Sequence, residues 1–199
     1  SLDGKVVVYK RVLPEGNYSR SSSINDPTAN DESFGHKISA HEQDGVIAIS
    51  PMVSNLGRYG RVELFDLQLD GSWHHLKTIW SENNESGNYF GSDHSFSGNN
   101  IIVGAPKESA GGLAYIFTKA DVGNWDNLSS QTLVSSTLSP NDDFGNSVEI
   151  SEEFAFVGAI NGDGNLTNAG VVYVFEKTLN SWQETAKIIP PRSEERRVG

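Results

Sequence analysis

The chain is defined first by what it lacks. It has 199 residues and no cysteine, so disulfides and thiolate metal sites are excluded within this span, while the compartment stays open. No apolar run approaches the roughly 18 residues of a membrane-spanning helix. Lys and Arg number 15 against 26 Asp and Glu, and the net charge is −11. This balance argues against a nucleic-acid partner, which needs a basic face, and its simplest interpretation is solubility.

Motifs for catalysis are also missing. The sequence contains neither G-x-S-x-G nor H-E-x-x-H. The acidic pairs Asp142-Asp143 and Glu152-Glu153 are adjacent in sequence, whereas a hydrolase places two carboxylates about 5 to 9 Å apart across one bond. We therefore interpret Asp142-Asp143 as part of a turn. We predict that this span is not an enzyme.

The five histidines do not form a metal-binding pattern. His74 and His75 are adjacent, so on a strand they point to opposite faces and do not easily join one site. His36 and His94 stand at different distances from the nearest preceding Phe-Gly pair, and His41 has no nearby partner in sequence. A zinc site needs three or four convergent ligands, so packing or surface roles are favoured for all five.

What the chain does contain is a repeat. Three Phe-Gly pairs recur at steps of 56 and 54 residues: Phe34-Gly35, Phe90-Gly91 and Phe144-Gly145. The stretch from Asn141 to Trp182 holds the clearest copy. Periods of 20 to 50 residues or slightly more indicate solenoids, propellers or arrays.

Other positions agree between the copies. Val103-Gly104-Ala105-Pro106 and Val157-Gly158-Ala159-Ile160 follow their Phe at the same offset, and Ile49-Ser50-Pro51 follows Phe34 with a predicted one-residue insertion. A glycine then precedes an aromatic residue by five positions, and a tryptophan follows the aromatic. These sets are Gly60, Phe65 and Trp73; Gly112, Phe117 and Trp125; and Gly170, Phe175 and Trp182.

Each copy is predicted to form four short strands. Residues 45–50, 61–69 and 73–80 are apolar runs rich in β-branched and aromatic residues, separated by Gly, Asn, Asp and Ser turns. Residues 4–10 predict a further strand, followed by a weak strand near Tyr18 and a loop. No window has a sustained helical period. The predicted fold is all-β, with four-stranded antiparallel blades of a β-propeller.

The repeated residue types suit blades that converge on an axis. Small residues such as Gly104 and Ala105 fit the crowded region near the axis, and large rings such as Phe117 and Trp125 fill the layer between facing sheets. A glycine after each Phe permits positive φ or a close backbone approach. Packing accounts for the whole set without any ligand.

The series FG…VGAP…G-x-x-Y-x-F…W resembles the FG-GAP repeats of integrin α-subunit heads and many secreted bacterial proteins. Phe90-Gly91 with Val103-Gly104-Ala105-Pro106, and Phe144-Gly145 with Val157-Gly158-Ala159, carry the resemblance. It implies a partial, unclosed propeller of three blades and a half. The predicted units are a half blade at 1–33 and blades at about 34–89, 90–143 and 144–191.

The family usually closes with more blades, so we expect the sequence to be a fragment of a longer protein. Its start at Ser1, in place of Met, agrees with that expectation. Residues 192–199, RSEERRVG, have no apolar pattern and read like a translated sequencing adapter. We interpret them as a non-native tail, with a surface linker as the alternative.

The resemblance also implies a possible cation site. In the family, the loop after the VGAP strand can bind Ca²⁺ through a D-x-D-x-D-G-x-x-D pattern. In the third copy the matching oxygen-bearing side chains are Asn161, Asp163, Asn165 and Asn168. Hard cations prefer such ligands, but only one of the four is a carboxylate. The alternative is a turn whose Asn and Asp side chains bond their own backbone.

Four Asn-x-Ser/Thr sequons occur, at Asn17, Asn84, Asn127 and Asn165, all in predicted loops. They are candidates for glycosylation if the protein is secreted by a eukaryote. Chance matches are common in a chain rich in Asn and Ser.

By the resemblance, the first functional hypothesis is a non-enzymatic scaffold for interaction or adhesion, extracellular or at the cell surface, whose loops bind a protein or a glycan. The second is an accessory or partial propeller of a secreted hydrolase. A third is structural repetition with Ca²⁺ as a stabilising ligand. A fold does not determine which of these holds.

Overall fold

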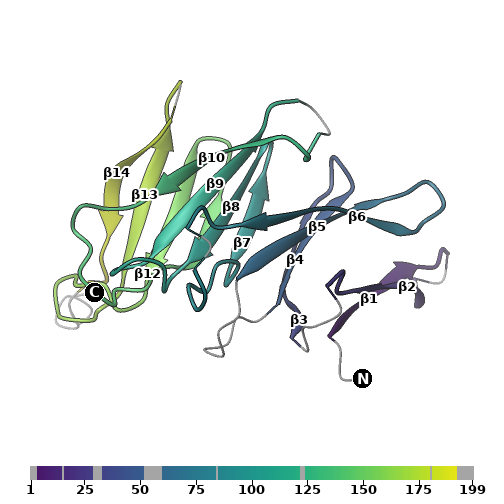
Figure 1. The fold of residues 1–199 in the computed structure, drawn as a ribbon, viewed down its shortest axis with the longest axis horizontal. Helices are drawn as coiled ribbons and strands as arrows, with labels where there is room; N and C mark the ends of the chain where they lie inside the picture. The colour runs from purple at the N-terminus through teal and green to yellow at the C-terminus, as the bar shows by residue number, and fades with distance from the viewer. Residues whose placement is uncertain are drawn as a thin grey trace.

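A computed structural model describes residues 4–14, 16–28, 33–51, 60–83, 85–121, 124–179 and 181–191. Within these residues every regular element is a β-strand (Figure 1). The strands form one two-stranded sheet and three four-stranded sheets, all antiparallel, and none of the sheets closes on itself. This confirms the prediction of an all-β fold made of partial propeller blades.

The two-stranded sheet, here the N-terminal hairpin, pairs β1 (Lys5–Arg11) with β2 (Tyr18–Asn25). The sequence indicated only a weak strand near Tyr18, but β2 continues through Asn25. It does so because seven of its residues pair with β1, including Ile24 with Val6. Ile24 is buried against the next sheet.

The three four-stranded sheets have the same strand order in space as in sequence. Sheet one contains β3 (Phe34–His41), β4 (Val46–Pro51), β5 (Arg61–Leu67) and β6 (Trp73–Trp80). Sheet two contains β7 (His94–Ser97), β8 (Asn100–Ala105), β9 (Leu113–Lys119) and β10 (Leu128–Leu133). Sheet three contains β11 (Phe144–Ile150), β12 (Phe154–Ala159), β13 (Val171–Lys177) and β14 (Trp182–Ile188).

The sheets stand side by side, in chain order from the N-terminal hairpin to sheet three (Figure 1). Their first strands contact one another in series, β3 with β7 and β7 with β11. These first strands therefore form the inner edge of the array. This is the arrangement of propeller blades, in which one strand of each blade lies nearest the axis.

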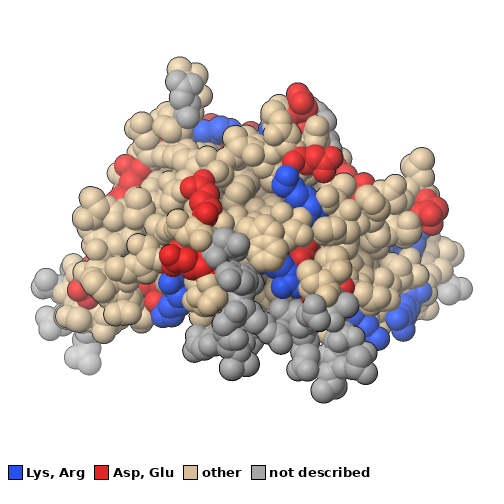
Figure 2. All heavy atoms as spheres, in the orientation of Figure 1, with Lys and Arg blue, Asp and Glu red and all other residues tan. Residues whose placement is uncertain are grey.

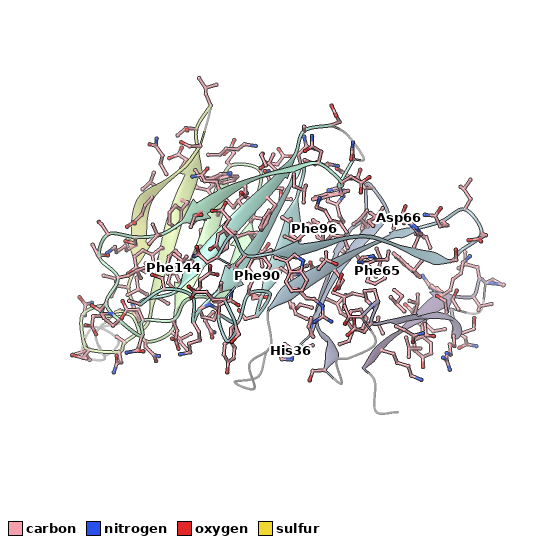
Figure 3. The ribbon with its side chains drawn as sticks, in the orientation of Figure 1. His36, Phe65, Asp66, Phe90, Phe96 and Phe144 are labelled. Carbon is pink, nitrogen blue, oxygen red and sulfur yellow. The ribbon has the colours of Figure 1, made fainter. Side chains whose placement is uncertain are left out.

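Each Phe-Gly pair begins a sheet at its inner edge. Phe34, Phe90 and Phe144 are all buried, at 4%, 0% and 0% exposure. Figure 3 shows Phe90 and Phe144 pointing into the body of the molecule from neighbouring sheets. The following glycines share a left-handed backbone, with φ of 97°, 87° and 92° at Gly35, Gly91 and Gly145. The glycine is therefore required by backbone geometry, as the sequence indicated.

Close approach between sheets is a second reason for the glycines. A methyl group added at Gly112 would come within 2.2 Å of the Phe144 carbonyl oxygen, and one at Gly60 within 2.3 Å of the Phe90 carbonyl oxygen. The glycine before the third strand of one sheet thus receives the Phe of the next sheet. This contact explains why the two glycine-containing motifs recur together in every copy.

The apolar core lies between the sheets as three separate layers. The first layer, between the hairpin and sheet one, contains Ile24, Phe34, Ile49 and Phe65. The second and third layers, between sheets one and two and between sheets two and three, are larger and better filled. The predicted role of the aromatic residues in packing between sheets is confirmed.

The tryptophans belong to these layers. Trp125 is 1% exposed, and its ring lies 5.1 Å from Phe96 and 5.5 Å from His41 of sheet one. Its indole N–H donates to Asp44 Oδ2 at 2.8 Å. Trp125 therefore joins sheets one and two through both its ring and its N–H group.

The spacing of the first copy needs one correction. The sequence predicted a one-residue insertion before Ile49-Ser50-Pro51, but the register pairs Phe34 with Pro51 and Phe144 with Ala159, which requires two extra residues. They lie in the turn between β3 and β4, where four residues separate the pair His41 and Val46. The glycine in the other copies, Gly158, therefore corresponds to Ser50, which donates to the Gly91 carbonyl at 2.6 Å.

Candidate functional site

The connections between strands gather at two ends of the array. One end, here called the loop end, carries the β8–β9 loop (106–112), the β12–β13 loop (160–170) and the segments that join one sheet to the next. They meet there because the start of each first strand pairs with the end of the second strand, as Phe144 pairs with Ala159. The opposite end carries the short hairpin turns. Loops on a rigid scaffold are the usual place for binding residues.

Asp143 joins three segments at the loop end. Its Oδ1 lies 2.5 Å from Lys107 Nζ of sheet two, and its Oδ2 accepts a hydrogen bond from Asn161 Nδ2 at 3.1 Å. Asn161 Nδ2 also donates to the Asn141 carbonyl at 3.2 Å. Asp143 is 6% exposed and has a positive φ of 59°. The sequence-based interpretation of Asp142-Asp143 as turn residues is confirmed, and Asp142 accepts from the Ser139 N–H at 2.8 Å.

Glu108 is the second carboxylate of the loop end, and it is fully buried. It accepts hydrogen bonds from Asn83 Nδ2 at 2.8 Å and from Tyr115 Oη at 2.7 Å, both at Oε1. Asn88 Nδ2 donates to Oε2 at 3.3 Å. Burial and the hydrogen bond to Glu108 raise the pKa of Tyr115, so the phenol stays protonated as a donor. This cluster holds the sheet connection in place and offers no free carboxylate for catalysis.

The predicted cation loop is part of the same end. Asp163 Oδ1 accepts from the Asn168 N–H at 2.9 Å, which closes a turn in which Asn168 has a φ of 55°. Asn161 points to Asn141 and Asp143, and Asn165 Nδ2 donates to the Pro190 carbonyl at 3.3 Å. The side chains are thus bound to three different parts of the molecule. This arrangement fits an Asn- and Gly-rich turn better than an oxygen shell, and calcium binding stays a prediction.

The histidines lie at separate places. His74 and His75 contact different acids, Asp66 at 3.5 Å and Glu63 at 2.8 Å, as expected for neighbours on opposite faces of β6. His94 donates to or accepts from Ser39 Oγ at 2.6 Å. Among the described residues, no three His, Cys, Asp or Glu side chains gather in a way that could hold a metal ion.

A row of polar contacts along the inner edge was not predicted from the sequence. Lys37 Nζ lies 2.6 Å from Asp93 Oδ1, and Asp93 Oδ2 accepts from the Val148 N–H at 2.8 Å. Ser95 Oγ also donates to Glu149 Oε1 at 2.5 Å. The signal was present in the third and fifth residues after each Phe, which are polar in every copy. Their contact became visible only when β3, β7 and β11 were placed side by side.

Three of the four sequons lie in described parts of the chain. Asn17, Asn127 and Asn165 are exposed, and none lies within a strand. Asn84 falls outside the described residues, as do residues 192–199 of the predicted non-native tail. Exposure permits glycosylation at the three sites, which stays a prediction.

The comparison with known proteins agrees with this architecture. A model of the FG-GAP repeat matches residues 73–117 and 129–175. The chain therefore belongs to the FG-GAP repeat family over residues 73–175. No curated protein matches the chain.

The matched segments do not coincide with the sheets. The first runs from the start of β6 in sheet one to Phe117 in β9 of sheet two, and the second runs from β10 of sheet two to Phe175 in β13 of sheet three. Each sequence repeat therefore spans two sheets. This offset couples neighbouring sheets covalently as well as by packing.

Among the described residues, no helix is long and apolar enough to cross a membrane.

Proposed function

We propose that the chain is a non-enzymatic interaction scaffold, extracellular or at the cell surface, whose loop end binds a protein or glycan partner. The supporting observation is a contrast within the repeat. The Phe-Gly positions are buried with the same backbone conformation in all three sheets, whereas the loops differ. The β12–β13 loop spans 160–170 and the β8–β9 loop only 106–112.

The chemistry of the loop end is polar and suits such a partner. In the β12–β13 loop, Asp163, Asn165 and Thr167 are exposed and carry hydrogen-bonding groups, and Leu166 is 68% exposed between them. A glycan or a polar protein surface could use these donors and acceptors together with one apolar contact. Asp and Glu side chains are dispersed on the face in Figure 2 among uncharged residues, so a contact dominated by charge is not favoured.

The test is binding of the full chain to a glycan array and to intact cells, measured by fluorescence. In the test variant, residues 161–168 are replaced by the shorter loop 107–110. The matched control is Leu179→Ser in the β13–β14 turn at the opposite end, where Leu179 is fully exposed. Loss of binding in the loop variant alone, with an unchanged melting temperature, supports the proposal.

Equal binding by the chain, the loop variant and the control contradicts it, and so does the absence of binding on both arrays and cells. A calcium titration by calorimetry is a separate measurement. Heat at millimolar calcium that disappears in Asp163→Asn supports calcium as a ligand of this loop, and no heat argues against it.

A further inference from the structure

The outer face of sheet three repeats a surface that is covered elsewhere in the molecule. Three side chains on the second and third strands of each sheet point toward the next sheet. In sheet two these residues are Ile102, Ala114 and Ile116, and in sheet three they are Phe156, Val172 and Val174.

Burial separates the two sets. Ile102 and Ala114 have no exposure and Ile116 has 1%, because sheet three covers them. Phe156 and Val172 are only half-buried, and Val174 is 8% exposed. The outer face of sheet three thus has the apolar residues of a sheet contact without a covering sheet among the described residues.

A groove crosses this face. It has a volume of about 440 Å³ and is lined by Gly158, Ala159, Ala169, Gly170 and Val172 on the strands, with residues 188–191 as its wall. A smaller hollow of about 130 Å³, beside Phe156 and Val172, continues it toward the inner edge. The lining of the groove is mostly apolar.

The equivalent grooves of sheets one and two hold a Phe-Gly pair. Gly112 receives the backbone of Phe144, so a methyl group there would lie 2.2 Å from its carbonyl oxygen. Gly170 stands at the same repeat position in sheet three. A methyl group there would meet only Ile160 and Ala159 of its own sheet, at 3.5 Å or more.

The hydrogen-bonding groups repeat as well. The Phe144 N–H donates to the Gly111 carbonyl across the sheet contact at 2.9 Å, and the Asn141 N–H donates to the Ala110 carbonyl at 2.8 Å. Ala169 and Asn168 occupy the matching positions in sheet three. Their carbonyls stand where an incoming Phe-Gly strand would place its N–H groups.

We infer that the groove on sheet three is a docking site for the Phe-Gly strand of a further FG-GAP repeat. The ring would lie over Phe156, Val172 and Val174, and the glycine backbone would pass Gly158 as Gly145 passes Gly104. There a methyl group at Gly104 would lie only 1.9 Å from the Gly145 carbonyl oxygen. The partner is defined by an internal interface that the molecule already uses twice.

The direct test uses the full chain and a synthetic peptide with the sequence of residues 139–150, which contains Phe144-Gly145. Titration of ¹⁵N-labelled protein should shift the amide signals of Gly158, Ala169, Gly170 and Val172. A peptide with Phe144→Ala should bind at least about tenfold more weakly, because it lacks the buried ring.

The variant Phe156→Lys should weaken binding of the unmodified peptide by at least about tenfold. Leu179→Lys is the matched control, because Leu179 is fully exposed at the opposite end of sheet three, and it should leave binding unchanged. Shifts that map to another surface, or equal binding of both peptides, overturn the inference.

A second measurement covers the case of a peptide that binds too weakly to detect. Residues 139–191 are duplicated after Pro191, which raises the effective concentration to about the millimolar range. The extended chain should melt higher than the original. Phe156→Lys should remove that gain, and so should Ala in place of the second Phe, with no further loss when both are combined. No gain, or effects that simply add, overturns the inference.

Discussion

The first and second layers between sheets solve the same packing problem with different chemistry. The first layer, between the N-terminal hairpin and sheet one, has only four buried apolar residues and a network of charges. The second layer, between sheets one and two, has twelve buried apolar residues. A hairpin of two strands offers less apolar surface than a sheet of four, and polar partners fill the difference.

The charged network of the first layer surrounds Glu63. Its carboxylate has no exposure and accepts from Arg61 Nε at 2.7 Å, from Thr78 Oγ1 at 2.7 Å, and contacts His75 Nε2 at 2.8 Å. Arg61 also donates to Asp26 Oδ2 at 2.7 Å. Burial alone would raise the pKa of Asp26, but bonds from Thr28 and Arg61 outweigh it and lower that pKa.

In the second layer a tyrosine stands at the same repeat position. Tyr115 follows Gly112 by three residues, as Glu63 follows Gly60, and its phenol donates to Glu108. The carboxylate is thus retained but moved to a loop, and the strand contributes an aromatic ring. The comparison teaches that this position must hydrogen-bond, while the partner is open to change.

The largest effect is expected from Arg61→Met, which breaks the network of the first layer. The guanidinium is removed while Glu63 and Asp26 stay buried, so the free energy of unfolding should fall by about 3–5 kcal/mol. Urea unfolding followed by tryptophan fluorescence measures it. The double variant Arg61→Met/Glu63→Leu should recover part of the loss. A single variant as stable as the original chain would mean that water reaches Glu63.

Gly91→Ala and Gly35→Ala compare how tightly the two layers are closed. Both glycines have positive φ, but an added methyl group would meet the Arg61 backbone at 2.7 Å from Gly91 and only the flexible Val6 side chain at 3.1 Å from Gly35. Strained φ costs about 1–2 kcal/mol in both, and Gly91→Ala should cost about 1–2 kcal/mol more. Equal losses by thermal unfolding would contradict the difference in closeness.

The second layer should also respond to pH through His94. Burial and the positive charge of Lys37 lower the pKa of His94 to about 3. The unfolded chain binds a proton at about pH 6.5, so stability should fall as pH drops from 6.5 toward 3, by up to about 1.4 kcal/mol per pH unit. Unfolding in urea between pH 4 and 7 measures the slope, and His94→Gln should reduce it. An unchanged slope would assign the pH response to other groups.

Tyr115→Phe should have the smallest effect, because it removes one hydrogen bond and keeps the ring. Glu108 retains its bonds to Asn83 and Asn88, so a loss of about 1–2 kcal/mol is expected. Urea unfolding measures it beside Tyr173→Phe in the third layer. A loss comparable to that of Arg61→Met would show that the two layers depend on their polar centres equally.

The sequence by itself determined the repeat, the strand content and the glycines that must take positive φ, because these depend on local spacing and on backbone sterics. It also determined the family. Sequence spacing misplaced the insertion before Ser50, since a two-residue extension of a turn leaves the strand pattern intact and is visible only in the register.

Only the tertiary structure decided which groups meet. Lys37 and Asp93, Arg61 and Asp26, and Lys107 and Asp143 are far apart in the chain, and no local pattern pairs them. The same holds for the groove on sheet three, whose residues look like ordinary core positions in the sequence. Whether an apolar side chain is covered depends on a neighbouring sheet, and that neighbour is a property of the assembled array.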